Sequence, residues 1–109
     1  MTVEPIPPTA VVRVSRATFD PERFAEVQEM TVAIGRYLIP AIKELPGLIS
    51  YHAATSPDGS SIHVSVWESD EHAQQMSRLK EMIVDARQAG EQAGLVFTPI
   101  VNHPIDWTI

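Results

Sequence analysis

Residues 45–69, LPGLISYHAATSPDGSSIHVSVWES, decide the fold of this chain of 109 residues. Pro46 and Gly47 end a helix, and two runs rich in β-branched and aromatic residues follow at 48–55 and 61–67. The segment 56–59 between them is a turn in which Gly59 supplies a positive φ. The stretch therefore predicts a β-hairpin, with His63 and Trp67 on the same face of its second strand.

The turn also predicts how the two strands pair. A three-residue loop at 57–59 sets Ser56 opposite Ser60. Counting back along the hairpin, Ala53 then faces His63, Tyr51 faces Ser65 and Ile49 faces Trp67, and these six residues form one patch. The opposite face carries Ile62, Val64, Val66, Leu48, Ser50, His52 and Ala54.

Residues 10–45 predict a strand followed by a helix. The strand covers 10–18 and places Arg13 and Arg16 on opposite faces. Asp20 is expected to cap the helix, and Pro21 suits its first position. Apolar residues recur at spacings of three and four to Leu45, but Pro40 predicts a kink or break near residue 38.

The remainder of the chain predicts a second helix and a last strand. Ser69 or Asp70 caps the helix, whose inner stripe is His72, Met76, Leu79, Ile83, Ala86 and Gly90. The strand covers 95–101, and Pro99 places it at a sheet edge or on a bulge. We expect an irregular arm at 1–9, one domain at 10–102 and an extended tail at 103–109.

The order β-α-β-β-α-β predicts an α+β, ferredoxin-like fold, a four-stranded antiparallel sheet with two helices on one face. The helices cover only that face, yet both faces of the strand at 61–67 are rich in uncharged residues. Burial of an aliphatic side chain is worth about 1.5–3 kcal/mol. We therefore expect a homodimer with sheet against sheet around a two-fold axis.

Composition excludes several kinds of protein. The chain has 14 acidic and 8 basic residues, a net charge of −6, which argues against nucleic acid or an anionic membrane as partner. It has no cysteine, so disulfides, thiol catalysis and thiolate metal sites are ruled out. No signal peptide, membrane span or metal-binding motif is evident, and we expect a cytoplasmic protein without a metal site.

The Leu-Pro-Gly-Leu-Ile segment at 45–49, the hairpin, and Val-Trp-Glu-Ser-Asp-Glu-His-Ala at 66–73 resemble the dimeric α/β barrel proteins. Within them, the chain looks most like the antibiotic biosynthesis monooxygenase (ABM) branch over residues 10–102. The resemblance implies two ferredoxin-like sheets facing each other as a barrel, with a small-molecule pocket between each sheet and its own helices. Trp67 matches the pocket tryptophan of that family, and His63 lies where its quinone-forming oxygenases often carry asparagine.

The resemblance implies a monooxygenase that oxidises a small polycyclic or phenolic aromatic with O₂ and without a cofactor. His63 is the candidate base, because histidine titrates near neutral pH. Trp67 is the candidate wall of the pocket. His72 is a candidate second polar contact, although it could instead pair with Glu68. The remaining candidate ligand contacts are Tyr51, Met76 and Leu79.

Alternatives remain open. The same dimer could hold a small ligand, or serve in a stress response, without chemistry, and His63 and Trp67 could simply be packed core residues. The haem-degrading relatives carry an asparagine on the first strand and a later histidine, whereas this chain has Arg13 and Ser15 there and only His72. Arg13 could bind an anionic ligand, pair with a carboxylate, or lie at the rim, and the sequence does not separate these roles.

Overall fold

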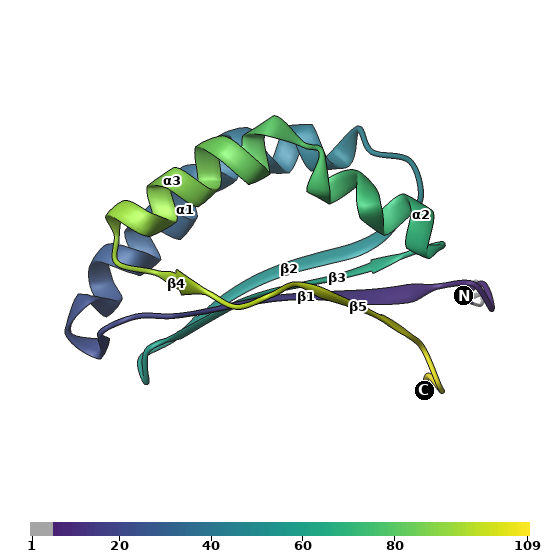
Figure 1. Ribbon diagram of the computed structural model, residues 1–109, viewed down its shortest axis with the longest axis horizontal. Helices are drawn as coiled ribbons and strands as arrows, with labels where there is room; N and C mark the ends of the chain where they lie inside the picture. Colours follow the sequence, from purple (N-terminus) through teal and green to yellow (C-terminus); the bar gives the residue numbers. More distant parts are fainter. Residues whose placement is uncertain (1–5) are drawn as a thin grey trace, which may run out of the picture.

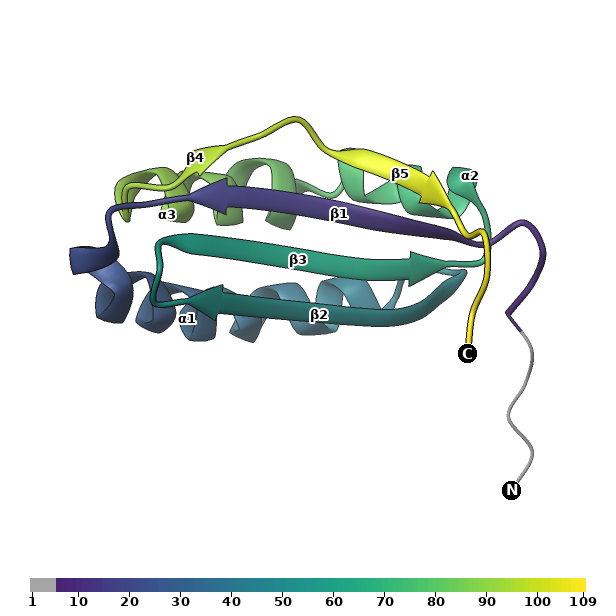
Figure 2. The same cartoon turned by 90° about the horizontal axis from the view of Figure 1, so that it is seen from below.

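A computed structural model describes residues 6–109 and shows one antiparallel sheet with every helix on the same side (Figures 1 and 2). The predicted arm at 1–9 falls partly outside the described residues. The strands are β1 (Val11–Thr18), β2 (Leu48–Ser56), β3 (Ser60–Trp67), β4 (Val96–Phe97) and β5 (Val101–Pro104). Their order is β2-β3-β1-β4, and β5 also pairs with β1. The predicted α+β ferredoxin-like arrangement is confirmed.

The hairpin register is confirmed over most of its length. Ser56 pairs with Ser60, Ala53 with His63 and Tyr51 with Ser65, and Gly59 has the expected positive φ of 102°. The predicted pairing of Ile49 with Trp67 is wrong, because the register shifts between residues 48 and 50 and Leu48 lies opposite Trp67. A β-bulge of this kind places one extra residue in a strand, so Ile49 is left 41% exposed.

The first helix begins as predicted but does not break. Asp20 accepts a hydrogen bond from the Glu22 backbone N–H (3.0 Å), and the turn η1 (Pro21–Arg23) leads into α1 (Phe24–Lys43). The expected break near residue 38 is wrong, since α1 runs through Pro40, whereas a kink there stays a prediction. Proline cannot donate to the carbonyl four residues earlier, that of Arg36. Both residues lie on the exposed side of α1, where water can satisfy that carbonyl.

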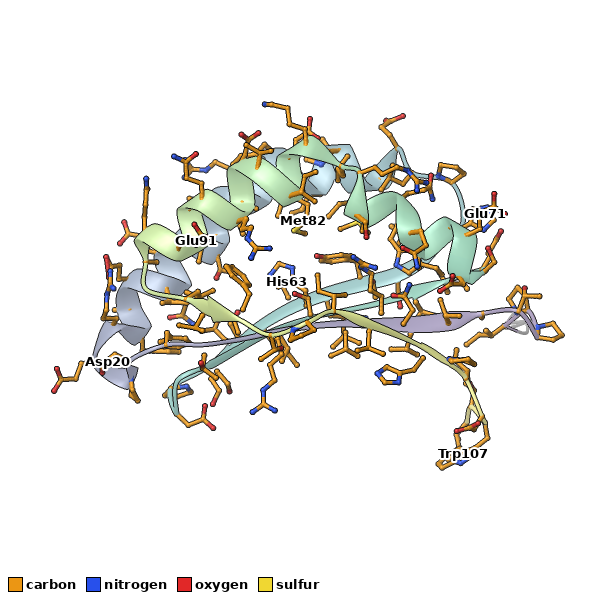
Figure 3. The ribbon with its side chains drawn as sticks, viewed as in Figure 1. Asp20, His63, Glu71, Met82, Glu91 and Trp107 are labelled. Atoms are coloured by element: carbon orange, nitrogen blue, oxygen red, sulfur yellow. The ribbon has the colours of Figure 1, made fainter. Side chains whose placement is uncertain are left out.

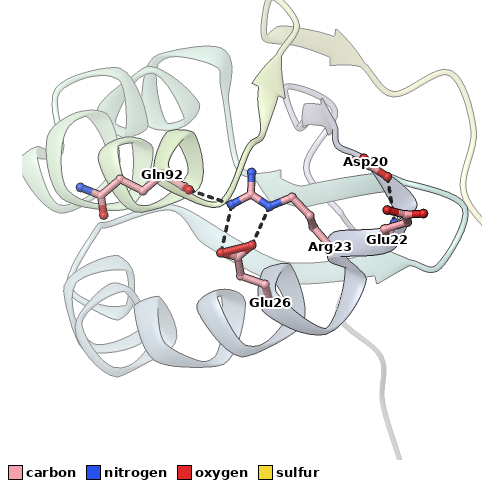
Figure 4. A network of polar contacts seen from close by, with 5 residues as sticks. All are labelled: Asp20, Glu22, Arg23, Glu26 and Gln92. Carbon is pink, nitrogen blue, oxygen red and sulfur yellow. Dashed lines mark hydrogen bonds and ion pairs between the residues drawn. The ribbon is translucent and has the colours of Figure 1, made fainter.

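The start of α1 is tied to the last helix by Arg23 (Figure 4). Its guanidinium donates to both carboxylate oxygens of Glu26, at 2.6 and 3.0 Å, and to the backbone carbonyl of Gln92 at 3.0 Å. The ion pair is largely exposed to water, so its contribution to stability is small.

The second helical segment is broken, whereas one continuous helix was predicted. Ser69 caps α2 (Asp70–Ala73) as expected, and the 3₁₀ turn η2 (Gln74–Ser77) follows. After Arg78 the chain restarts as the π-helix η3 (Glu81–Ala86) and continues as α3 (Arg87–Gln92). The wider π turn rotates the predicted inner stripe, so Met76, Ala86 and Gly90 are buried but Ile83 is 44% exposed.

The predicted last strand at 95–101 is split in two. Residues 98–100 leave the sheet around Pro99, and β4 and β5 pair with opposite ends of β1. Proline has no N–H to give to a sheet, which explains the gap. Because β5 includes residues 103 and 104, the sheet extends into the segment predicted to be a tail.

The core lies between the sheet and the helices, and no helix formed by residues 6–109 covers the opposite face of the sheet (Figure 1). The larger cluster of buried side chains includes Trp67, Val11, Ile34, Leu38 and Ile42. No helix within residues 6–109 is long and apolar enough to cross a membrane.

Candidate functional site

A central cavity lies between the inner face of the sheet and the arch of helices. Its volume is about 200 Å³. Strands β1 and β3 supply its floor, with His63 and Ser15, while Met30 of α1 and Met82 of η3 cover it. Figure 3 shows the His63 side chain extending from the sheet toward the helical layer. The cavity therefore places apolar side chains of the helices opposite the imidazole of His63 in its floor.

Tyr51 holds the imidazole of His63 in place. The Tyr51 hydroxyl and His63 Nδ1 are 2.5 Å apart, and the two rings meet edge to face at 87° with their centroids 5.6 Å apart. The contact follows from the hairpin register, because Tyr51 and His63 lie diagonally on the same face of adjacent strands. With Nδ1 engaged, Nε2 is the ring nitrogen left for a ligand.

Burial sets the protonation state of both groups. It lowers the pKa of His63, so the imidazole is neutral at physiological pH. Burial also raises the pKa of Tyr51 well above its usual range, against the opposing field of Arg13, so the phenol keeps its proton. A neutral imidazole beside a protonated phenol can accept a proton from a ligand when Nδ1–H donates to the phenol oxygen and Nε2 carries the lone pair.

A second, side cavity adjoins the first at His63. It has a volume of about 580 Å³ and lies between α1 and the edge strand β2. Thr31, Ile34 and His63 line both cavities. Tyr51 and Ala53 line the side cavity only. His63 thus stands at the junction of two spaces rather than at the end of one.

Trp67 lines neither of these cavities, nor a third space, a cleft between residues 97–102 and the segments α2 and η2. Its side chain is fully buried in the larger core cluster, and its Nε1–H donates to Ser65 Oγ at 2.8 Å. The structure therefore places Trp67 and His63 on one face of β3, as predicted, but gives only His63 a surface on a cavity. A direct contact between Trp67 and a ligand stays a prediction.

The other predicted contacts are divided. Met76 lines the central cavity. Leu79 packs against the core cluster and lines none of the three cavities. His72 does not line them either, because its ring lies against Gly47 and its Nδ1 is 2.8 Å from Ser69 Oγ. That bond replaces the pairing with Glu68 that the sequence suggested.

Arg13 is a buried member of the site, and the sequence left three roles open for it: binding an anionic ligand, pairing with a carboxylate, or lying at the rim. It is 8% exposed, and it lines the central cavity and also a cleft of about 640 Å³. The cleft lies between residues 97–102 and the segments α2 and η2. Alternation along β1 could place Arg13 on the inner face. Its partners, Ser77 and Asn102, are too distant in sequence to be inferred.

No group of three or more His, Asp or Glu side chains within residues 6–109 is placed to hold a metal ion.

The fold has been seen before in several solved structures. SnoaB, a cofactor-independent oxygenase from Streptomyces nogalater, superposes with a TM-score of 0.59 at 17% identity, covering 93% of this chain and 97% of SnoaB. A candidate antibiotic biosynthesis monooxygenase from Deinococcus radiodurans gives a TM-score of 0.68 at 15% identity, covering 91% and 95%. A dimeric ferredoxin-like protein from an uncultured marine organism gives 0.70 at 12% identity, covering 93% and 91%.

These likenesses show that the chain has the fold of ABM-type, ferredoxin-like proteins, and at these identities they show the fold alone. No protein-family model matches the sequence. No curated protein matches it either.

Proposed function

We propose that the protein is a small homodimeric oxygenase that oxidises a planar phenolic or polycyclic aromatic with O₂ and no bound cofactor. The observation that carries the proposal is His63. A neutral, half-buried imidazole stands between two cavities, oriented by Tyr51, in the fold that SnoaB also has. A base held in an apolar space suits the first step of such a reaction, removal of a proton from an electron-rich ring.

The reaction balances without any group beyond substrate and O₂. His63 takes a proton from an activated ring CH₂, and the carbanion passes one electron to O₂. The resulting carbon radical and superoxide combine to a peroxide anion, which eliminates hydroxide to leave a ring C=O. The hydroxide takes the proton back from His63 as water. One oxygen atom enters the ring and the other leaves as water, so the base is regenerated in each turnover.

Oxygen uptake with a panel of hydroxylated anthrones tests this proposal. We expect His63→Gln to lose about 10²–10⁴-fold in rate, the usual contribution of a positioned general base. His52→Gln is the matched control, because His52 lies on the opposite face of the same hairpin and is exposed. No oxygen uptake by the wild type with any compound, or full activity in His63→Gln, would contradict the proposal.

A second candidate function is binding of a small ligand without chemistry. The side cavity favours it, since about 580 Å³ lies within the roughly 300–1,000 Å³ of most small-molecule sites and its lining is mainly aliphatic. Ligand binding by the wild type without oxygen uptake would support this second function.

The dimer is part of the proposal and rests on the uncovered face of the sheet. That face carries four valines that are only partly covered within the single chain: Val12, Val14, Val64 and Val66. Ile62 beside them is 37% exposed. A second copy seated there would bury these side chains, each for about 1.5–3 kcal/mol. A molar mass of one chain at micromolar concentration, measured by light scattering, would overturn this part.

A further inference from the structure

Arg13 is a buried cation without a carboxylate partner. The ion pairs within residues 6–109 are Arg23–Glu26, Lys80–Asp85 and Arg87–Glu91, and none involves Arg13. Buried charges are costly unless an opposite charge or several hydrogen bonds compensate for the lost water. Two neutral groups bind Arg13, Asn102 Oδ1 at 3.2 Å and Ser77 Oγ at 3.2 Å.

An acidic residue is nearby but is held away from the guanidinium. Asn102 accepts from Arg13 through its oxygen and donates through Nδ2 to Asp70 Oδ1 at 3.0 Å. The amide therefore lies between the two charges, and Asp70 acts on Arg13 only through its field. Arginine has five N–H donors, of which these contacts use two. The planar fork remains able to receive an anion.

The position of Arg13 defines what kind of anion would reach it. The cleft and the central cavity meet at five side chains that line both spaces: Arg13, Ser77, Arg87, Phe97 and Ile100. The Arg87 guanidinium lies 5.3 Å from the centre of the Phe97 ring and also pairs with Glu91. A ligand that spans the boundary meets a cation on one side and apolar or aromatic surface on the other.

We propose that Arg13 and Ser77 bind the carboxylate of an aromatic acid whose ring extends from the cleft toward the central cavity. The carboxylate matches the guanidinium fork in charge and geometry, and Phe97 and Ile100 contact the ring. The inference deepens the proposed function by assigning its substrate class, aromatic rings that carry a carboxylate. The anion site itself stands on Arg13 and does not need the ring to be oxidised.

Calorimetric titration with 2-naphthoate and 2-naphthamide at pH 7.5 tests the site, because the two compounds differ only in the charged group. We expect the wild type to bind the carboxylate about 10- to 100-fold more tightly than the amide. The ratio should fall to about one in Arg13→Gln. Arg16→Gln is the matched control and should keep the wild-type ratio, since Arg16 is exposed on the other face of β1.

Equal affinity of the wild type for the two compounds, no binding of either, or an unchanged ratio in Arg13→Gln would overturn the inference. If Arg13→Gln does not fold, Ser77→Ala is measured in its place. Removal of this one hydroxyl donor should still lower the ratio of the two affinities at least threefold. An unchanged ratio would count against the site. Neither compound is oxidised in this assay. Selective binding without oxygen uptake on anthrones would therefore reject the proposed function alone, and uptake without selectivity would reject the anion site alone.

Discussion

Replacement of Trp67 by phenylalanine should weaken the folded state far more than it changes ligand binding. The indole is fully buried and lines none of the three cavities described for residues 6–109. Its N–H donates to the hydroxyl of Ser65, which is itself 2% exposed. Trp67→Phe therefore removes both packed volume and the partner of a buried polar group.

The expected cost follows from these two losses. A buried hydroxyl left without its partner costs about 1–3 kcal/mol. The smaller ring adds about 1–2 kcal/mol, a fraction of the cost of a full Trp→Ala truncation. The free energy of unfolding should thus fall by about 2–5 kcal/mol. Adding Ser65→Ala should recover part of this loss, because the double variant leaves no orphaned hydroxyl.

Urea denaturation followed by far-UV circular dichroism measures the change. Trp107→Phe is the matched control, because Trp107 is 77% exposed and its replacement should stay within about 0.5 kcal/mol of the wild type. Fluorescence would mix the two indoles, so the dichroism signal is preferred. With a slope of about 2 kcal/mol per molar urea, the midpoint of Trp67→Phe should drop by about 1–2.5 M.

Two results would refute the reasoning. One is a midpoint for Trp67→Phe equal to that of Trp107→Phe, which would mean that the indole is not packed as described. The other is a normal midpoint with a tenfold loss of naphthoate affinity or oxygen uptake, which would place Trp67 at the ligand, as the sequence alone suggested.

Four further outcomes are expected. Burial lowers the pKa of His63 below the 6.5 of an unfolded histidine, so on acidification the unfolded chain binds the proton first. The free energy of unfolding should therefore decrease as the pH falls below about 6.5. Urea titrations of His63→Gln should lack this part of the pH dependence. Gly47→Ala should cost about 2–4 kcal/mol in the same assay, since φ is 84° and a Cβ would lie 2.3 Å from His72 Cγ; a cost below 1 kcal/mol would contradict that packing. Pro40→Ala should raise the thermal midpoint by restoring a hydrogen bond inside α1, and a lowered midpoint would count against a continuous helix. Val64→Lys should convert a dimer into monomers by light scattering, whereas a retained dimer would exclude the uncovered face as the contact.

The sheet could be predicted because its signals are local. Alternation along residues 61–67 sorted the side chains into two faces, the family resemblance of Trp67 indicated which face meets the helices, and the turn ending at Gly59 determined most of the register. The bulge at Ile49 could not be foreseen, because it depends on how the end of β2 meets Trp67 after the helix ends.

The helices show where local signals fail. Pro40 indicates a break in any helix, but its cost depends on whether the unpaired carbonyl reaches water, which only the packed structure decides. Periodicity likewise predicts an α-helix over 81–86, where the structure has the π-helix η3, a rare form for which the apolar pattern gives no signal.

Only the part of the candidate site that depends on local pairing could be predicted from the sequence. Its His63–Tyr51 pair follows from the hairpin register, although the hydrogen bond itself was not anticipated. The setting of Arg13 depends on Ser77 and Asn102, which lie 64 and 89 residues away in the chain. Contacts between segments so distant have no periodic signature in a single sequence.

The position of β2 at the margin of the sheet has a consequence for handling the protein. The strand pairs with β3 on one side only, and its nine residues, Leu48–Ser56, include no lysine, arginine, aspartate, glutamate or proline. A strand at a sheet edge without charged residues or proline offers its unpaired backbone N–H and C=O groups to any other exposed strand. Heating or prolonged concentration should therefore produce intermolecular β-structure that begins at this strand, and a lysine introduced near its turn would be the first change to make for a long-lived sample.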